Sequence, residues 1–298
     1  MTVAWWKELQ ALGECRENEP MARHTTLAVG GETRWFFRPQ NRAAIVTAVQ
    51  KIPFDIPLLP LGRGSNLLVS DDGFAGVVMD VSDLNDIRVQ SQSLHAGCGV
   101  RMSRVARQCA EHGLSGLEFM ATVPGDVGGG VAMNAGAFGQ QVSDCLTGIE
   151  LVTRQGEVQA IDAAQLQMAY RYTQLPAGSL VLSADFALQS GDAQAIRERM
   201  RHMRAKRGST QPLELPNCGS VFKNPQGDHA ARLIEAAGLK GLRIGGARIS
   251  DKHANFIVNE GGAKSSDVLA LIRQARETVE QRFGVCLEPE VRALGETL

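Results

Sequence analysis

Two glycine-rich segments of the chain have the composition of ligand-binding turns. The first, LPLGRGSNLLVSDDGFAG, spans residues 59–76, and the second, VPGDVGGGVAMNAGAFG, spans residues 123–139. Glycine adopts positive φ without strain and lets a backbone come close to a ligand. Successive N–H groups in such turns can surround an anion. The pattern therefore favours two turns that close on one diphosphate, as in a dinucleotide cofactor.

Neither segment is a common nucleotide-binding motif. A P-loop needs GxxxxGK[ST], and no lysine follows the glycines of either segment. A Rossmann fingerprint needs GxGxxG between a strand and a helix, which neither segment provides. Two tight turns in a mixed sheet, without a ligand, remain an open alternative from these residues alone.

Composition excludes several other functions. The chain has 298 residues, a formal net charge of −1 and no long apolar run. Nucleic acid is therefore not expected as the main partner, and the basic stretch 197–207 is expected to be the solvated face of a helix. No membrane span and no signal peptide are expected, which favours the cytoplasm. The six cysteines lack a CxxC pair and the six histidines are scattered, so reduced thiols and no metal site are expected.

Short strands and helices must position these turns. The spacing of apolar residues predicts helices over 4–15, 100–112, 195–206, 228–238 and 265–284. Strands are expected at 33–39, 56–62, 76–81, 92–99 and 179–188, with a hairpin over 146–161. Asp228 is expected to cap the fourth helix, and Ser265 or Ser266 the last one, which Gly284 should end. The change in character near 197–210 predicts a domain boundary.

The two glycine-rich segments closely resemble the flavin-binding segments of the UDP-N-acetylenolpyruvoylglucosamine reductase (MurB) family. Further matching segments are YRYTQLP (170–176), NCGSVFKNP (217–225), HANFIVNEGGAKSSDV (253–268) and LEPEVR (287–292). The similarity covers residues 20–295, nearly the whole chain. It implies an α+β fold. A two-part FAD-binding domain of the PCMH type over 21–200, with subdomains 21–80 and 81–200, would follow an N-terminal helical segment 1–20. A smaller α+β substrate-binding domain would occupy 201–298.

The resemblance also implies roles for particular residues. Ser220 matches the family's proton donor, Arg171 the arginine that faces the substrate carboxylate, and Glu290 a third catalytic residue. The residues expected to bind FAD are Gly62, Arg63, Gly64, Ser65, Asn66, Pro124, Gly125, Gly128, Gly129, Asn134 and Gly136. The residues expected to contact the UDP-sugar are Asn224, Lys223, Arg207 and Gln211. Glu288 is the position most easily confused with Glu290, because residues two apart on a strand face the same side.

Three features depart from the family pattern. His24 stands where the family usually has asparagine, which affects one turn contact. Asp126 lies next to the expected diphosphate, and because an unpaired carboxylate there would be repulsive, it is expected to point away or to cap the next turn. The chain also resembles the shorter type of the family, without a tyrosine-bearing lid loop.

The implied activity transfers a hydride from NADPH to FAD, and then to the enolpyruvyl ether of UDP-N-acetylglucosamine. NADPH and a UDP-sugar are thus the expected small-molecule partners, and the sequence gives no oligomeric state. Three alternatives stay open: another FAD oxidoreductase of this domain family acting on a small alcohol or sugar, a flavin-binding module without turnover, and a structural protein with glycine-rich turns. The first usually tethers its flavin through His or Cys, and the third would not take up FAD.

Overall fold

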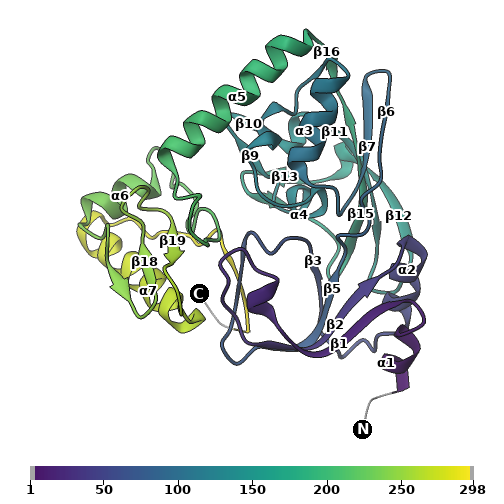
Figure 1. The fold of residues 1–298 in the computed structure, drawn as a ribbon, viewed down its shortest axis with the longest axis horizontal. Coiled ribbons are helices and arrows are strands. Elements are labelled where there is room, and N and C mark those ends of the chain that lie inside the picture. Colours follow the sequence, from purple (N-terminus) through teal and green to yellow (C-terminus); the bar gives the residue numbers. More distant parts are fainter. Residues whose placement is uncertain (1–3, 296–298) are drawn as a thin grey trace. The chain divides into compact units, whose positions relative to one another are not determined.

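The computed structural model describes residues 4–295, which form two compact units (Figure 1). The first unit contains the stretches up to Glu17, Trp35–Arg63 and Gly76–Lys206. The second contains Asn18–Arg34, Gly64–Ala75 and the chain from Arg207 onward. The domains expected from the sequence, 21–200 and 201–298, are continuous, and their boundaries stay predictions.

The main sheet of the first unit has five antiparallel strands in the order β12-β11-β15-β7-β6. Its strands are β6 (Ile87–Gln90), β7 (Ser93–Gly97), β11 (Leu146–Val152), β12 (Val158–Asp162) and β15 (Leu180–Ala187). The predicted hairpin is confirmed, since β11 pairs with β12. The predicted helix over 100–112 is α3 (Met102–Glu111), and its predicted apolar face is buried.

A second sheet has the order β1-β2-β5-β3, and its β3 and β5 are parallel. Its strands are β1 (Gly13–Pro20), β2 (Glu32–Pro39), β3 (Leu58–Leu61) and β5 (Phe74–Asp80), and the helices nearest to them in sequence are α1 (Ala4–Leu9) and α2 (Arg42–Lys51). The expected helix over 4–15 is therefore too long. It gives way to β1 at Gly13, where a side chain would collide with the Arg38 carbonyl oxygen across the sheet.

The remaining elements of the first unit are short. They are β8 (Leu114–Ser115), η2 (Glu118–Ala121), α4 (Val127–Ala132), β9 (Gly136–Ala137), β10 (Gln140–Gln141), η3 (Val142–Asp144), η4 (Ala163–Gln165), β13 (Met168–Ala169), β14 (Tyr172–Thr173) and β16 (Gln189–Ser190). Helix α4, in the second glycine-rich segment, packs on β15 and β7. The apolar core of this unit fixes both elements, because it contains Val127 and Val131 of α4 and Leu182 of β15.

The second unit has its own apolar core, between a small sheet and two helices. Its elements are η1 (Met21–Arg23), β4 (Leu67–Val69), α6 (Ala230–Ala236), β17 (Arg243–Ile244), β18 (Ala247–Ile249), β19 (Ile257–Asn259), α7 (Ser265–Phe283) and β20 (Arg292–Leu294). The predicted face of α7, including Val268, Leu271 and Ile272, is buried in this core. Strand β20 pairs in parallel with β4. The long helix α5 (Ala193–Thr210), green in Figure 1, leads into this unit and runs further than the expected 195–206.

The expected caps of two helices are wrong. The first N–H groups of α7 come from Ser265 and Ser266 themselves, and they donate to the carboxylate of Asp71 at 2.7 and 3.0 Å. At α6 the Ala230 N–H donates to the Asn224 side-chain oxygen at 3.1 Å, whereas Asp228 pairs with Arg232. Gly284 ends α7 in the left-handed conformation, as predicted. Among residues 4–295, no helix has the length and apolar character needed to cross a membrane.

Candidate active site

The two glycine-rich segments meet inside the first unit, at Gly62 and Asp126. A Cβ atom added to Gly62 would lie 2.8 Å from Oδ2 of Asp126, so only glycine leaves room for this approach. Gly62 follows β3 directly, and Asp126 precedes α4 directly. The structure therefore brings together two segments that lie about sixty residues apart in the sequence, as one shared binding turn would require.

Asp126 does not cap the following helix, so that alternative of the expectation is wrong, and the other alternative, that it points away from the diphosphate, is left open. Its residue is 4% exposed, its side chain makes no capping hydrogen bond to α4, and neither carboxylate oxygen has a hydrogen-bond partner among the described residues. Burial raises the pKa of Asp126 to about 6, against the opposing effect of Arg63 and Arg101. Asp126 is not among the residues expected from the sequence to bind FAD. The only sign of it in the sequence is an acidic residue inside a glycine-rich turn.

The three consecutive glycines, Gly128, Gly129 and Gly130, lie in two different kinds of surroundings. A Cβ atom on Gly128 would lie 2.9 Å from Cβ of Cys98, and one on Gly130 would lie 2.8 Å from Sδ of Met102. These two glycines let α4 pack closely against Cys98 and Met102. A Cβ atom on Gly129 would meet nothing within 4 Å, so this position faces open space.

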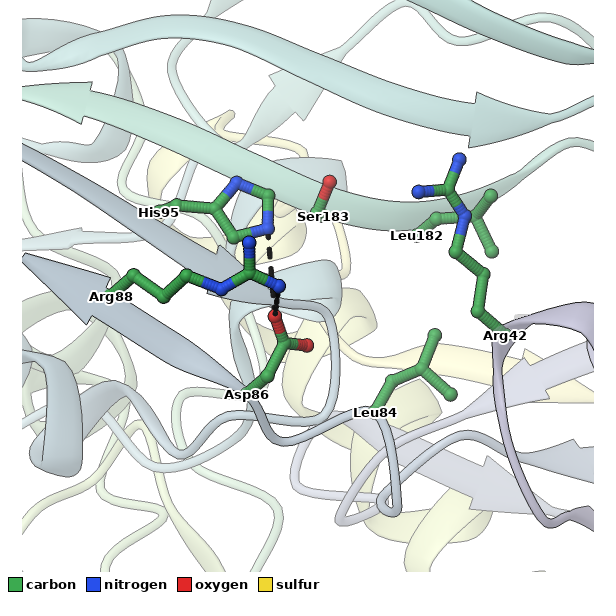
Figure 2. Close-up of a pocket in the computed structure, with 7 residues that line it drawn as sticks. All are labelled: Arg42, Leu84, Asp86, Arg88, His95, Leu182 and Ser183. Carbon is green, nitrogen blue, oxygen red and sulfur yellow. Dashed lines mark hydrogen bonds and ion pairs between the residues drawn. The ribbon is translucent and has the colours of Figure 1, made fainter.

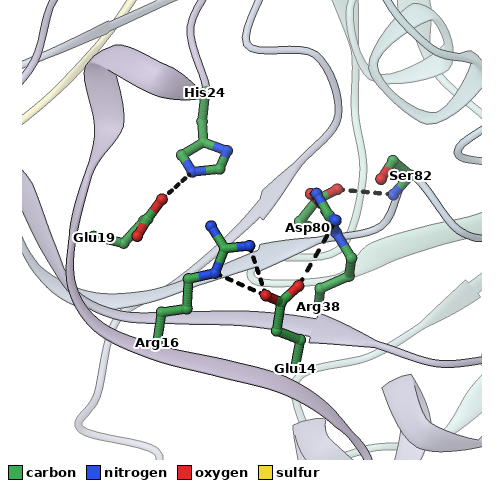
Figure 3. Close-up of polar contacts among 7 residues, drawn as sticks. All are labelled: Glu14, Arg16, Glu19, His24, Arg38, Asp80 and Ser82. Carbon is green, nitrogen blue, oxygen red and sulfur yellow. Dashed lines mark hydrogen bonds and ion pairs between the residues drawn. The ribbon is translucent and has the colours of Figure 1, made fainter.

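The first turn continues into the second unit at Gly64, which has a φ of +59°. A side chain on Gly64 would collide with the carbonyl oxygen of His24. The His24 ring is fixed in turn, because its Nε2 lies 2.8 Å from Oε1 of Glu19 (Figure 3). His24, which departs from the family pattern, thus packs against the turn through its backbone and pairs with Glu19 through its ring.

Ser65 and Asn66, in the same turn, lie beside the segments of two predicted catalytic residues. The Asn66 side-chain amide donates to the Glu290 carbonyl oxygen at 3.0 Å. The Glu290 N–H donates to the carbonyl oxygen of Val221, the residue after Ser220, at 2.7 Å. A Cβ atom on Gly219, the residue before Ser220, would lie 4.0 Å from the Ser65 carbonyl oxygen. The second unit therefore brings the chain segments that contain Ser65, Asn66, Ser220 and Glu290 next to one another.

Lys223 and Asn224 already have partners within the second unit. The Lys223 ammonium group donates to Oε1 of Glu288 at 2.5 Å. Asn224 accepts from the first N–H of α6, as described above. Glu288 is therefore an exposed ion-pair partner of Lys223, whereas Glu290 is half-buried.

Arg207 and Gln211 lie at the end of α5 with unmet hydrogen-bonding capacity. Nε of Arg207 and Oε1 of Gln211 are both buried without a partner among the described residues. Burial also lowers the pKa of Arg207. Two such groups one helical turn apart are suited to a polar ligand, because buried polar atoms are normally hydrogen-bonded.

Arg171 lies in the first unit, in a two-residue turn between β13 and β14. Its φ is +57°, a conformation that side chains other than glycine adopt at a cost. One guanidinium nitrogen donates to the Gly136 carbonyl oxygen at 3.0 Å, and the guanidinium carbon lies 4.9 Å from the centre of the Tyr170 ring. The hairpin thus holds the arginine head group in one place.

The other residues expected to bind FAD also lie in the first unit. Asn134 is fully buried, and its side chain bonds to Gln141, Ala169 and the Ser143 N–H. These contacts give Asn134 a structural role, and its contact with FAD stays a prediction. Gly125 has a φ of +112° and accepts from the Met102 N–H, next to Pro124.

A separate pocket of about 220 Å³ lies in the first unit (Figure 2). Its lining residues are Arg42, Leu84, Asp86, Arg88, His95, Leu182 and Ser183. His95 and Arg88 both face Asp86, and Arg42 pairs with Glu150. None of the residues expected to act on a substrate lines this pocket. Among residues 4–295, no group of three or more His, Cys, Asp or Glu side chains could hold a metal ion.

The residues of the glycine-rich turns fit a diphosphate-containing cofactor. Gly62 and Gly64 keep the turn free of side chains, Gly129 faces open space, and the Asp126 carboxyl is buried without a partner beside Gly62. Such a group is costly unless a ligand or a proton satisfies it. Residues 33–162, which include all of these positions, match the family model of an FAD binding domain. Fold and site together define an FAD-binding flavoprotein.

Residues 211–294 match the model of the UDP-N-acetylenolpyruvoylglucosamine reductase C-terminal domain. The chain is 46% identical over 285 residues to the UDP-N-acetylenolpyruvoylglucosamine reductase of Alkalilimnicola ehrlichii, covering 95% of this chain and 96% of that one. It is 43% identical over 281 residues to that of Exiguobacterium sibiricum, covering 94% and 92% of the two chains. The crystal structure of the reductase from Thermus caldophilus aligns with a TM-score of 0.82 at 33% identity, over 95% of this chain and 98% of that one.

The chain belongs to the UDP-N-acetylenolpyruvoylglucosamine reductase family. This confirms the resemblance seen in the sequence, and with it an FAD-binding domain followed by the C-terminal domain of this family. The shorter type, without a lid loop, stays a prediction.

Proposed function

We propose that the chain reduces UDP-N-acetylglucosamine enolpyruvate to UDP-N-acetylmuramate, as a UDP-N-acetylmuramate dehydrogenase of peptidoglycan precursor synthesis in the cytoplasm. When bound, FAD supplies the hydride chemistry, taking a hydride from NADPH and passing it to the enolpyruvyl ether. Family membership supports the activity. The hydrogen bond from the Glu290 N–H to the Val221 carbonyl is the structural observation that carries the site, because it holds two predicted catalytic segments together.

Ser220 would donate the proton that completes the reduction. Hydride addition to one alkene carbon leaves negative charge on its neighbour, and this carbon must be protonated. A serine hydroxyl is a weak acid, so it needs a positioned partner. Glu290 would be this partner, because its N–H donates to the carbonyl oxygen of the residue after Ser220 and Asn66 fixes the chain at Glu290.

Arg171 would bind the substrate carboxylate and stabilise the charge that develops in the transition state. A guanidinium group can bind a carboxylate through two parallel hydrogen bonds and stays charged. The bond to the Gly136 carbonyl and the Tyr170 ring fix the head group before substrate arrives. Preorganised charge of this kind supports catalysis because it costs no reorganisation during the reaction.

Arg207 and Gln211 would contact the UDP group. The buried Nε of Arg207 and Oε1 of Gln211 have no hydrogen-bond partner among the described residues, which supports this role. Lys223 and Asn224, the other two residues expected to contact the UDP-sugar, already have partners. To bind a diphosphate, Lys223 would have to break its ion pair with Glu288. Asn224 would have to bind the substrate while its side-chain oxygen still accepts from the first N–H of α6.

Anaerobic stopped-flow absorbance of the flavin tests this function. Wild-type protein, Ser220→Ala and Ser103→Ala receive NADPH and then UDP-N-acetylglucosamine enolpyruvate. Ser103 is an exposed helical position, so its variant controls for the loss of a hydroxyl group. We expect all three flavins to bleach equally with NADPH, and reoxidation by the sugar to slow by at least ~10²-fold in Ser220→Ala alone, a typical general-acid contribution. Wild-type reduced flavin that ignores the enolpyruvyl sugar would refute the proposed activity, and Ser220→Ala with a wild-type second phase would remove Ser220 from it.

A further inference from the structure

Asp126 is a buried carboxyl group that the proposed reaction does not use. It is 4% exposed, and both of its oxygens lack a hydrogen-bond partner among the described residues. A buried polar group without a partner is rare and costly. An ionised carboxylate in such a place costs more free energy than a protonated carboxyl group. Asp126 therefore destabilises the FAD-free protein in either form, and more when it is ionised.

Oδ2 of Asp126 borders the backbone of the first glycine-rich turn. A Cβ atom on Gly62 would lie 2.8 Å from this oxygen, so the carboxyl group faces the turn directly. This is the turn in which the proposed function places the FAD diphosphate. The Asp126 carboxyl group thus lies directly behind the Gly62 backbone, and a diphosphate bound at this turn would have it as a neighbour.

The charged groups around Asp126 come from several elements. Arg63 in the turn and Arg101 before α3 act on it as positive charges, and Asp80 at the end of β5 acts as a negative one. Asp80 is held by Arg38 at 2.6 Å and by the Ser82 N–H at 3.0 Å (Figure 3). The Cys98 thiol, also close, has its pKa raised to about 12 by burial and by Asp126. Asp126 therefore lies between positive and negative groups, and burial, the largest cause, raises its pKa to about 6 against the two arginines.

We propose that Asp126 is a cofactor-positioning residue that binds the flavin diphosphate in its neutral form, donating its carboxylic O–H to a phosphate oxygen. A proton held on Asp126 converts a repulsive carboxylate into a hydrogen-bond donor, and Arg63 and Arg101 supply the positive potential that a diphosphate requires. The proposal rests on the proposed function, because it takes FAD to occupy this turn.

The pH dependence of FAD binding follows from this assignment. Burial raises the pKa of Asp126 to about 6 in the free protein, and a diphosphate neighbour raises it further. Only the neutral form binds well, so the dissociation constant of FAD stays flat below pH 6. Between that pH and the higher pKa of the complex, it rises toward about tenfold for each pH unit.

The experiment measures FAD release from the full-length holoprotein on dilution, by recovery of flavin fluorescence, from pH 5.5 to 9. Asp126→Asn keeps the shape and a donor but cannot ionise. Asp83→Asn makes the same change at an exposed aspartate of the first unit and is the matched control. We expect the wild type and Asp83→Asn to lose FAD steeply as the pH rises above 6, and Asp126→Asn to show a flat profile.

Stability of the FAD-free protein gives a second readout. The folded pKa of Asp126 lies above the 3.8 of an unperturbed aspartate, so the contribution of Asp126 to wild-type stability falls as the pH rises from about 4 to about 6 and then stays level. Asp126→Asn should lack this decrease. It should therefore be more stable than the wild type at pH 8, measured by urea unfolding.

Other results would overturn the proposal. Equal pH slopes in the wild type and Asp126→Asn would show that Asp126 does not titrate with FAD binding. Tighter wild-type binding at high pH, lost in Asp126→Asn, would show an ionised carboxylate that accepts from a flavin hydroxyl group instead. Absence of FAD binding by all variants at every pH would refute the proposed function itself.

Discussion

Arg171 occupies a backbone conformation that favours glycine, and the chain keeps an arginine there. Its positive φ of +57° falls at the second residue of a two-residue turn, where type II turns normally have glycine. A strained residue persists only where its surroundings hold it, and such residues cluster at functional sites. The strain at Arg171 is therefore the structural counterpart of its proposed role toward the substrate carboxylate.

Replacement of Arg171 should separate stability from activity. Arg171→Gly relieves backbone strain of about 1 kcal/mol and loses contacts of similar size, to the Gly136 carbonyl and the Tyr170 ring. We expect the free energy of unfolding to change by no more than about 1 kcal/mol, and kcat to fall by about 10²–10³. Urea unfolding and steady-state kinetics measure the two effects.

Arg171→Lys is the matched control, because it keeps the charge and loses the planar fork. It should recover only part of kcat. A glycine variant with near wild-type kcat would contradict the role of Arg171, and so would a lysine variant that equals the wild type.

At the scale of elements, the short helix α4 places its consecutive glycines in different surroundings. Gly128 and Gly130 allow close contact with Cys98 and Met102, whereas Gly129 faces open space. Three identical residues in a row therefore have different tolerances. The sequence predicts that glycine matters here, but only the packing shows which glycine has which task.

Alanine substitutions at Gly128 and Gly129 test whether the two glycines differ in this way. Gly128→Ala should destabilise the FAD-free protein by about 1–3 kcal/mol, the usual cost of overpacking. Gly129→Ala should stabilise it by about 0.5–1 kcal/mol, because alanine favours a helix, and should weaken FAD binding, because a methyl group then covers the open face. Urea unfolding and flavin fluorescence titration measure these effects. Equal stabilities of the two variants, or a Gly129→Ala variant that binds FAD as the wild type does, would contradict this account.

The helix caps mark where sequence reasoning fails at this scale. A cap is usually sought within a few residues of the helix start. The carboxylate that receives the Ser265 N–H belongs to Asp71, 194 residues earlier in the chain, and α6 is capped by Asn224 rather than by its neighbour Asp228. Apolar periodicity, which is local, predicted the buried face of α7 correctly. Long-range side-chain contacts leave no such periodic trace.

At the scale of the whole molecule, the same limit appears in the compact units. Each unit combines segments far apart in sequence, and the parallel pairing of β4 with β20 joins Leu67 to Arg292. Local patterns predicted most strands, while the resemblance predicted the family and the residues of the site. The unmet hydrogen bonds of Asp126, Arg207 and Gln211 emerge only from burial in three dimensions.

The stoichiometry of turnover distinguishes a reductase of the enolpyruvyl sugar from an enzyme that only oxidises NADPH. Purified full-length protein loaded with FAD is mixed anaerobically with NADPH and UDP-N-acetylglucosamine enolpyruvate. NADPH oxidation is followed by absorbance and the sugar product by chromatography with mass detection. The account predicts one UDP-N-acetylmuramate for each NADPH oxidised, and no turnover without FAD. NADPH oxidation that needs oxygen and leaves the enolpyruvyl sugar unchanged would contradict it.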